Sequence, residues 1–196
     1  MHDEFDYCEG VQINREVEDF ELASYHGGKI GKWNLESARG KWLVVMFYPA
    51  DFTFVCPTEL EEAARLYPEF KKAGAELVSI STDTAFVHKA WHDHSPAIKK
   101  VEFPMLADPT GRVTRQFGVY IDEEGLALRG TFVIDPKGVL KTIEIHDNSI
   151  GRNIEETLRK IKAASYVSTH KGEVCPVSWQ PGGKTLKPSE KLIGTI

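Results

Sequence analysis

The residue with the clearest chemical potential is Cys56, which lies in the segment FYPADFTFVCPTEL (residues 47–60). An apolar strand is expected before it and a helix directly after it, because proline favours the first helical position. The amides and the dipole of a helix N-terminus stabilise an anion. Cys56 is therefore expected to react as a thiolate, whereas a cysteine that only packs would have fewer polar neighbours than Thr53 and Glu59.

Three kinds of chemistry are open to a lone thiolate. A dithiol site of the Cys-x-x-Cys type is excluded here, because Glu59 stands where the second cysteine of that motif would be. A cysteine hydrolase needs a histidine base, for which His146 is a candidate that the sequence does not place. Peroxide reduction needs only the thiolate, donors for the two oxygens and a permanent cation such as arginine.

The other candidate ligands and thiols are scattered. The three cysteines, Cys8, Cys56 and Cys175, are too few and too far apart for a disulfide framework or a zinc site. His88 and His92 have the spacing of metal ligands on a helix, but without the glutamate of a zincin motif they indicate a solvated helix face. Cys8 is interpreted as a spectator, with a regulatory or intersubunit thiol as the alternative.

Composition limits the class of protein. The chain has 196 residues, 41% hydrophobic residues and a formal net charge of −5, which argues against nucleic-acid binding and against anionic membranes. No apolar run approaches the roughly 18 residues of a membrane span, and the acidic N-terminus is unlike a secretory signal. These features favour a cytoplasmic protein with no membrane partner.

The elements that must position Cys56 alternate between strands and helices. Residues 41–48 form a continuous apolar run that is typical of a central strand, and residues 75–81 form a second. Between them a helix is expected from Pro57 to Gly74, kinked or restarted at Pro68. A further helix is expected after Thr82 or Asp83, with an apolar stripe of Phe86, Val87, Ala90 and Trp91.

The second half of the chain predicts a short strand and a short helix within residues 102–119 and a β-hairpin around the turn DPKG in residues 129–146. A last helix follows Gly151. This order indicates a thioredoxin-like α/β fold, with a central mixed sheet flanked by helices. We expect a domain over residues 1–167 and an extended C-terminal arm, residues 168–196, that carries Cys175.

Several motifs together resemble one family. Pro49, Thr53 and Cys56 have the spacing Pro-x-x-x-Thr-x-x-Cys, and VSISTD, FPMLADPTG, RGTFVIDPKG and GEVCPVSW follow in order. The chain is thereby identified as a member of the peroxiredoxins over essentially its whole length. It is most similar to typical two-cysteine members, and its C-terminal segment to the peroxidase component of bacterial alkyl hydroperoxide reductase.

The resemblance implies a role for each matching residue. Cys56 matches the peroxidatic cysteine, Thr53 the threonine that binds the peroxide, and Pro49 the proline that shields the thiolate. Arg129 matches the arginine that stabilises thiolate and transition state. Cys175 matches the resolving cysteine, which forms an intersubunit disulfide with Cys56 of another subunit.

The resemblance also implies a supporting network and partners. Glu59 and Arg152 match the pair that orients Arg129. The expected substrates are hydrogen peroxide and organic hydroperoxides, and no metal, haem, flavin or other cofactor is expected in this chain. A homodimer assembled as a ring of five dimers, recycled by a flavoprotein reductase or a thioredoxin-like donor, is implied. A holdase chaperone or a redox-signalling partner is the alternative from another class.

One departure from the family concerns overoxidation. Members that are readily converted to the sulfinic acid carry a Gly-Gly-Leu-Gly insertion and a C-terminal Tyr-Phe pair. Residues 91–103 here read WHDHSPAIKKVEF, and the chain ends in KLIGTI. We therefore expect fast disulfide formation and relative resistance to overoxidation.

Overall fold

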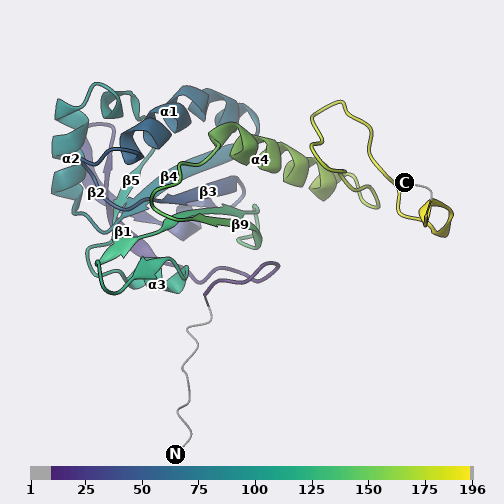
Figure 1. Cartoon of the computed structure of the whole chain (residues 1–196), viewed down its shortest axis with the longest axis horizontal. Coiled ribbons are helices and arrows are strands. Elements are labelled where there is room, and N and C mark those ends of the chain that lie inside the picture. Colours follow the sequence, from purple (N-terminus) through teal and green to yellow (C-terminus); the bar gives the residue numbers. More distant parts are fainter. Residues whose placement is uncertain (1–9, 195–196) are drawn as a thin grey trace, which may run out of the picture.

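A mixed seven-stranded sheet organises the chain in a computed structural model that describes residues 10–194 (Figure 1). The strand order is β2-β1-β5-β4-β3-β8-β9. These strands are β1 (Glu21–His26), β2 (Lys29–Asn34), β3 (Trp42–Phe47), β4 (Ala75–Ser81), β5 (Met105–Ala107), β8 (Arg129–Ile134) and β9 (Leu140–His146). The small strands β6 (Tyr120–Ile121) and β7 (Leu126–Ala127) pair with each other.

Helices cover both faces of this sheet. They are α1 (Cys56–Lys72), α2 (Ala85–His94), α3 (Arg112–Gln116) and α4 (Ile154–Thr169), with 3-10 turns η1 (Leu35–Ala38), η2 (Ile98–Lys100) and η3 (Glu190–Leu192). In Figure 1, α1 and α4 lie over one face and α3 lies on the other. The mixed sheet with flanking helices agrees with the sequence prediction.

Strand β3 lies inside the sheet, between β4 and β8, as expected for a strand whose side chains are all apolar and buried. It runs parallel to β4 and antiparallel to β8. Alternate side chains enter two cores, since successive residues of a strand face opposite sides. Val44 and Met46 join the core under α1 and α4, whereas Val45 and Phe47 join the core on the other face.

Most predicted elements are found where the sequence indicated them. The apolar run became β3, residues 75–81 became β4, and residues 129–146 formed the β8–β9 hairpin. Because β3 ends at Phe47 and α1 begins at Cys56, the connection between them carries the predicted peroxide-binding residues at one end of the sheet.

Two details of the prediction were wrong or incomplete. A restart of the helix at Pro68, one of the two predicted outcomes, is wrong: α1 runs through Pro68 as one helix, and its buried stripe, which includes Leu60 and Phe70, holds both halves on the sheet. Proline removes one helical hydrogen bond, and tertiary packing offsets that loss here. Strands β1 and β2 were not predicted, although Gly27 and Gly28 at φ 57° and 80° form the two-residue turn typical of a hairpin.

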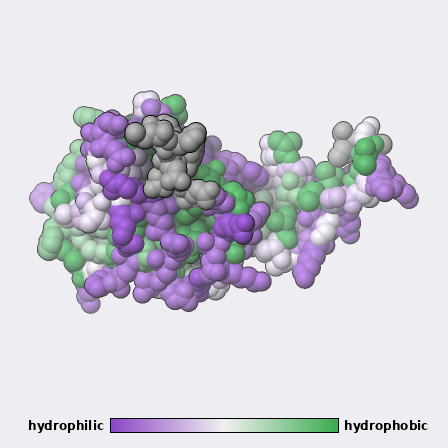
Figure 2. Space-filling model, turned by 90° about the horizontal axis from the view of Figure 1, so that it is seen from below, coloured by the Kyte–Doolittle hydropathy of each residue, from purple (hydrophilic) through white to green (hydrophobic). Residues whose placement is uncertain are grey.

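The C-terminal segment projects beyond the sheet. After α4 the chain forms an arm that stands away from the body (Figures 1 and 2). Val174 pairs with Leu186 in an isolated bridge, and Trp179 is buried, with its Nε1 donating to the Gly183 carbonyl at 3.1 Å. Val177 is 94% exposed. The arm therefore has local structure while it presents apolar surface.

Within residues 10–194 no helix has both the length and the apolar character needed to cross a bilayer. Cys8 lies outside the described residues, so its interpretation as a spectator is untested. The division into residues 1–167 and 168–196 also stays a prediction.

Candidate active site

Cys56 is the first residue of α1 and is fully buried. The helix begins with Pro57 in its first turn, and the amides of Thr58 and Glu59 already donate to the Val55 carbonyl. The positive end of the helix dipole therefore lies beside Sγ, as the sequence predicted. The sulfur is thus shielded from bulk solvent and lies at the positively polarised end of the helix.

Arg129 brings a permanent cation to the sulfur. It is the first residue of β8 and is 3% exposed. Its Nη1 donates to Cys56 Sγ at 3.4 Å and to Glu59 Oε2 at 2.9 Å. Its Nε and Nη2 both donate to the main-chain carbonyl of Asn148, at 3.0 and 2.8 Å. The guanidinium is thus held on two sides, with one nitrogen turned toward the sulfur.

Glu59 and Arg152 form the network that supports Arg129. Arg152 donates to Glu59 Oε1 from its main-chain amide and Nε, and to Oε2 from Nη2 at 2.7 Å. Burial alone would raise the pKa of Glu59, but hydrogen bonds and charge from Arg152, aided by the charge of Arg129, hold that pKa below its ordinary value. Glu59 is therefore a buried carboxylate that ties both arginines together.

Thr53 and Pro49 lie in the loop that leads to Cys56. Pro49 is buried and Thr53 is partly exposed. Thr53 Oγ1 donates a hydrogen bond to the Ala50 carbonyl at 2.8 Å. Its hydroxyl proton is therefore engaged, and its lone pairs can accept a hydrogen bond from a substrate. The structure records no hydrogen bond from Thr53 to the sulfur, and its link to Cys56 is their shared loop.

A buried polar cluster beneath this loop was not expected from the sequence. His88 was predicted on a solvated helix face, yet it is fully buried. Its Nε2 donates to the Leu106 carbonyl, which only accepts, and its Nδ1 lies 2.7 Å from Asp51 Oδ2. Tyr48 donates to Asp51 Oδ1 at 2.6 Å. Burial raises the pKa of Asp51, and His88 and Tyr48 oppose that rise.

The helical spacing of α2 held the signal for this correction. The buried positions of α2 are 85, 88 and 91, so His88 lies with Trp91 on the buried face of the helix and not on its exposed face. Phe86, expected on the apolar stripe, is instead 73% exposed. His92 belongs to a separate contact, because its Nδ1 lies 3.2 Å from Tyr25 Oη. Among residues 10–194 no group of His, Cys, Asp and Glu side chains is arranged to hold a metal ion.

His146 does not act on Cys56 in this structure. Its Nε2 pairs with Glu144 at 2.8 Å, and its Nδ1 faces the Ile150 carbonyl at 3.3 Å. Both ring nitrogens are therefore engaged away from the sulfur. The geometry gives no support to the cysteine hydrolase alternative, which needs a histidine base at the thiol.

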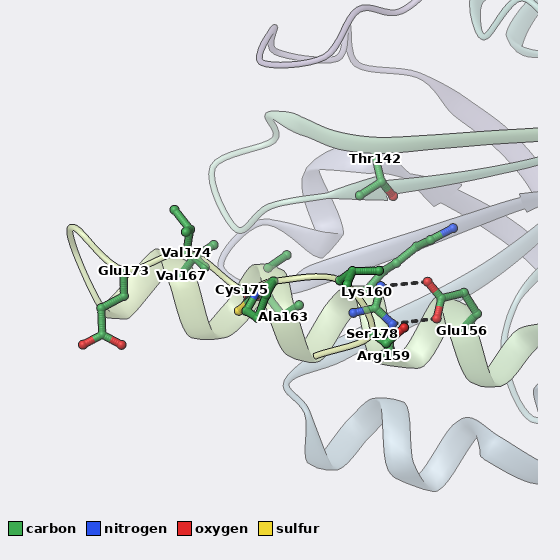
Figure 3. A pocket seen from close by; sticks show the side chains of 13 residues that line it. Thr142, Glu156, Arg159, Lys160, Ala163, Val167, Glu173, Val174, Cys175 and Ser178 are labelled. Atoms are coloured by element: carbon green, nitrogen blue, oxygen red, sulfur yellow. Dashed lines mark hydrogen bonds and ion pairs between the residues drawn. The ribbon is translucent and has the colours of Figure 1, made fainter. Parts of the chain in front are cut away.

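Cys175 lies in a different environment, on the arm against α4 (Figure 3). Its Sγ is 3.9 Å from the Ala163 carbonyl, and it lines a groove of about 730 Å³. Desolvation raises the pKa of the Cys175 thiol, Glu173 adds to that rise, and the nearby charge of Arg159 opposes it. Cys56 and Cys175 are both free thiols.

The structure therefore joins Cys56, Arg129, Glu59 and Arg152 in one hydrogen-bonded network. It leaves Cys175 apart from that network. The contribution of Asn148 has no signal in the sequence, because it comes from a main-chain carbonyl, which every residue possesses.

Comparisons with known proteins match nearly the whole chain to peroxiredoxins. The family model described as "AhpC/TSA family" matches residues 13–143, and the model described as "C-terminal domain of 1-Cys peroxiredoxin" matches residues 166–195. Alkyl hydroperoxide reductase C of Pseudomonas aeruginosa is 56% identical over 94% of this chain and 98% of its own. The protein of the same name from Bacillus subtilis is 48% identical over the same shares.

Solved structures confirm the thioredoxin-like fold. The crystal structure of Enterococcus faecalis AhpC matches with a TM-score of 0.82 and 44% identity, over 85% of this chain and 99% of that chain. Reduced 2-Cys peroxiredoxin of Plasmodium vivax matches with a TM-score of 0.87 and 32% identity, over 91% and 94% of the two chains. The chain therefore belongs to the AhpC/TSA family and is a thiol-dependent peroxidase of the peroxiredoxin type.

Proposed function

We propose that Cys56 is the peroxidatic cysteine and that the substrates are hydrogen peroxide and small organic hydroperoxides. The observation that carries this proposal is the 3.4 Å hydrogen bond from Arg129 Nη1 to the buried Cys56 Sγ. A permanent cation at the sulfur stabilises both the thiolate and the charge that develops during attack. The names of the relatives, alkyl hydroperoxide reductases, support the class of substrate.

In the first step the Cys56 thiolate attacks one peroxide oxygen. An S–O bond forms, the O–O bond breaks, and the sulfur is oxidised by two electrons to the sulfenic acid. The other oxygen leaves as hydroxide or alkoxide and takes up a proton. Thr53 Oγ1 accepts a hydrogen bond from the O–H group of the hydroperoxide, and Arg129 stabilises the developing charge. The buried Pro49 keeps water from the thiolate.

In the second step a thiolate on Cys175 of the partner subunit attacks the Cys56 sulfenic acid. The S–S bond forms, the S–O bond breaks, and the hydroxyl group leaves as water after protonation. The position of Cys175 on a projecting arm supports transfer between subunits, since the arm lies on its own α4, apart from its own Cys56 network. A separate disulfide reductase, a flavoprotein or a thioredoxin-like donor, then supplies two electrons and two protons.

The proposed assembly is a homodimer that closes into a ring of five dimers in the cytoplasm. Strand β9 is an edge of the sheet, and the arm exposes Val174 and Val177, which supports one interface. Phe52, Phe54 and Phe86 are 57%, 92% and 73% exposed around the loop and the start of α2, which supports a second. Apolar side chains grouped in this way are typical of interaction surfaces.

Peroxide consumption in the presence of a small dithiol tests the proposed function. Wild type is expected to turn over. The activity of Cys56→Ser is expected to fall to about a thousandth or less, because the serine hydroxyl is not ionised at neutral pH and cannot replace the thiolate. His94→Ala is the control and is expected to keep its turnover, since His94 is exposed and its Nδ1 lies against the Ala90 carbonyl of its own helix. Turnover by Cys56→Ser would contradict the proposal, and client protection without turnover in wild type would favour a chaperone.

A further inference from the structure

The loop between β9 and α4 reaches the peroxide site through one main-chain atom. The Asn148 carbonyl accepts two hydrogen bonds from Arg129, from Nε at 3.0 Å and from Nη2 at 2.8 Å. Two donors on one acceptor fix the rotation of a planar guanidinium in its own plane. With Nε and Nη2 bound in this way, Nη1 is the nitrogen left to face Cys56 and Glu59.

Glu59 cannot fix that rotation alone. Its carboxylate accepts three hydrogen bonds from Arg152 and one from Arg129, which together use the roughly four lone-pair sites of a carboxylate. Arg129 therefore makes a single hydrogen bond to Glu59, and a single bond leaves a guanidinium free to turn. The Asn148 carbonyl supplies the second point of attachment.

Asp147 folds the loop that presents this carbonyl. Its Oδ1 accepts from the Ser149 amide at 2.8 Å and from the Ser149 hydroxyl, and its own carbonyl accepts from the Ile150 amide at 3.0 Å. The loop is otherwise largely exposed, so few packing contacts hold it. Hydrogen bonds from the Ser149 side chain and amide, with the charge of Arg129, hold the pKa of Asp147 below its ordinary value.

We infer that Asp147 is a positioning residue of the peroxidase site, which folds the loop so that the Asn148 carbonyl holds Arg129 with Nη1 turned toward Cys56. The inference rests on the proposed role of Cys56 and deepens it. Asp147 acts through its capacity to accept hydrogen bonds from Ser149. Its negative charge is not required for that action.

Three variants test this role in a background where Cys8 and Cys175 are serine, so that Cys56 is the sole thiol. Asp147→Ala removes the acceptor, whereas Asp147→Asn keeps an acceptor oxygen and removes the charge. Asp135→Ala is the matched control at the other end of the β8–β9 hairpin, where Asp135 Oδ1 accepts from the Lys137 and Val139 amides at 2.9 and 3.0 Å. This substitution removes equivalent side-chain hydrogen bonds from a turn at the opposite end of strands β8 and β9 from Arg129.

Stopped-flow oxidation by hydrogen peroxide and the pH profile of alkylation by iodoacetamide are the measurements. Asp147→Ala is expected to slow oxidation about tenfold, the effect of one misplaced charge-assisted hydrogen bond, and to move the alkylation profile to higher pH. Asp147→Asn is expected to restore both to within about twofold of wild type. Asp135→Ala is expected to lower the melting temperature without changing either reading.

A double-mutant cycle with Arg129→Lys shows whether Asp147 acts through Arg129. Lysine lacks the Nε–H and second Nη donors that the Asn148 carbonyl holds, so Asp147→Ala is expected to cause no further loss in that background. Equal losses in both backgrounds, equal losses in Asp147→Asn and Asp147→Ala, or wild-type behaviour of Asp147→Ala would each overturn the positioning role. If Arg129→Lys itself reacts like wild type, the proposed function fails instead.

Discussion

Cys56 and Cys175, the two thiols within the described residues, have very different surroundings. Cys56 is fully buried at a helix N-terminus, and a hydrogen-bonded ion network positions a cation on its sulfur. Cys175 is partly exposed on an arm, with a raised pKa and a groove of about 730 Å³ beside it. One site has its groups fixed before any substrate arrives, and the other presents a thiol that is stabilised by few contacts.

This difference matches two different reactions. Attack on a small peroxide gains from fixed donors, because preorganised groups need no rearrangement when charge develops. Attack on a sulfenic acid of another chain needs access and reach, and a fixed environment would hinder it. In the proposed second step the buried Cys56 has to become accessible to Cys175, so we expect the first turn of α1 to open after oxidation.

Among changes that leave both thiols in place, the largest expected effect comes from Glu59, the buried carboxylate of the Cys56 site. Glu59→Gln removes the charge that ties Arg129 and Arg152 together. We expect kcat/KM for hydrogen peroxide to fall on the order of 10² to 10³, the range found when one stabilising group of an active site is removed. Lys187→Gln, which changes a partner of Glu173 on the arm, is the control and is expected to leave kcat/KM unchanged.

Equal rates in wild type and Glu59→Gln would show that the fixed network does not govern reactivity. Lower rates in Lys187→Gln would instead show that the arm contributes to peroxide attack, which would break the contrast between the two thiols.

Overoxidation separates the two sites in a second way. At high peroxide, wild type is expected to accumulate the disulfide, with the Cys56 sulfinic acid as a minor product, because residues 91–103 lack the insertion that slows opening in sensitive relatives. Cys175→Ser is expected to accumulate the sulfinic acid instead, since its sulfenic acid has no second thiol. Mass spectrometry of intact protein reads both outcomes, and ready sulfinic acid in wild type would contradict the expectation.

Acid should weaken the site around Cys56 by protonating Glu59. The pKa of Glu59 is lowered in the folded protein, so its contribution to stability is complete above the unfolded value of about 4.3 and is lost as the pH falls through the folded value. Glu59→Gln is expected to lower the free energy of unfolding by about 3 kcal/mol at pH 7, because it leaves two buried arginines without their counter-ion. Unfolding curves from pH 7 to pH 3 should show this difference shrinking, and a constant difference would contradict the assignment.

The smallest expected effect concerns the second thiol. Glu173 raises the pKa of Cys175, so Glu173→Gln should increase the thiolate fraction and speed disulfide formation about twofold at pH 7. In wild type the rate of this step should rise about tenfold per pH unit below that pKa. Rapid-quench sampling of the disulfide gives the rate, and a slower or pH-independent reaction in Glu173→Gln would exclude control by thiolate formation.

The sequence predicted the centre of the fold better than its edge. Strands β3 and β4 were found because their side chains are almost all buried, which gives a continuous apolar run. Strand β2 was missed because its residues are exposed or only partly buried, so no apolar period marks it. The turn residues Gly27 and Gly28 held the better signal for that hairpin.

The candidate site was predictable only in part, and for a physical reason. The neighbours of Cys56 in the sequence were enough to place it at a helix N-terminus and to predict a reactive thiol. Arg129 was predicted only from the family resemblance, because 73 positions separate it from Cys56. His88 was mistaken for a surface residue because its polarity outweighed its place on the buried face of α2. Side-chain patterns carry no information on main-chain acceptors, which is why Asn148 was not found.

Non-reducing electrophoresis after one equivalent of hydrogen peroxide, followed by peptide mapping of the disulfide, tests the division of labour between the two thiols most directly. Wild type is predicted to shift to a covalent dimer in which Cys56 is bonded to Cys175 of the partner subunit, and neither Cys56→Ser nor Cys175→Ser is predicted to shift. Efficient dimer formation by Cys175→Ser, with the bond mapped to Cys8, would contradict the account.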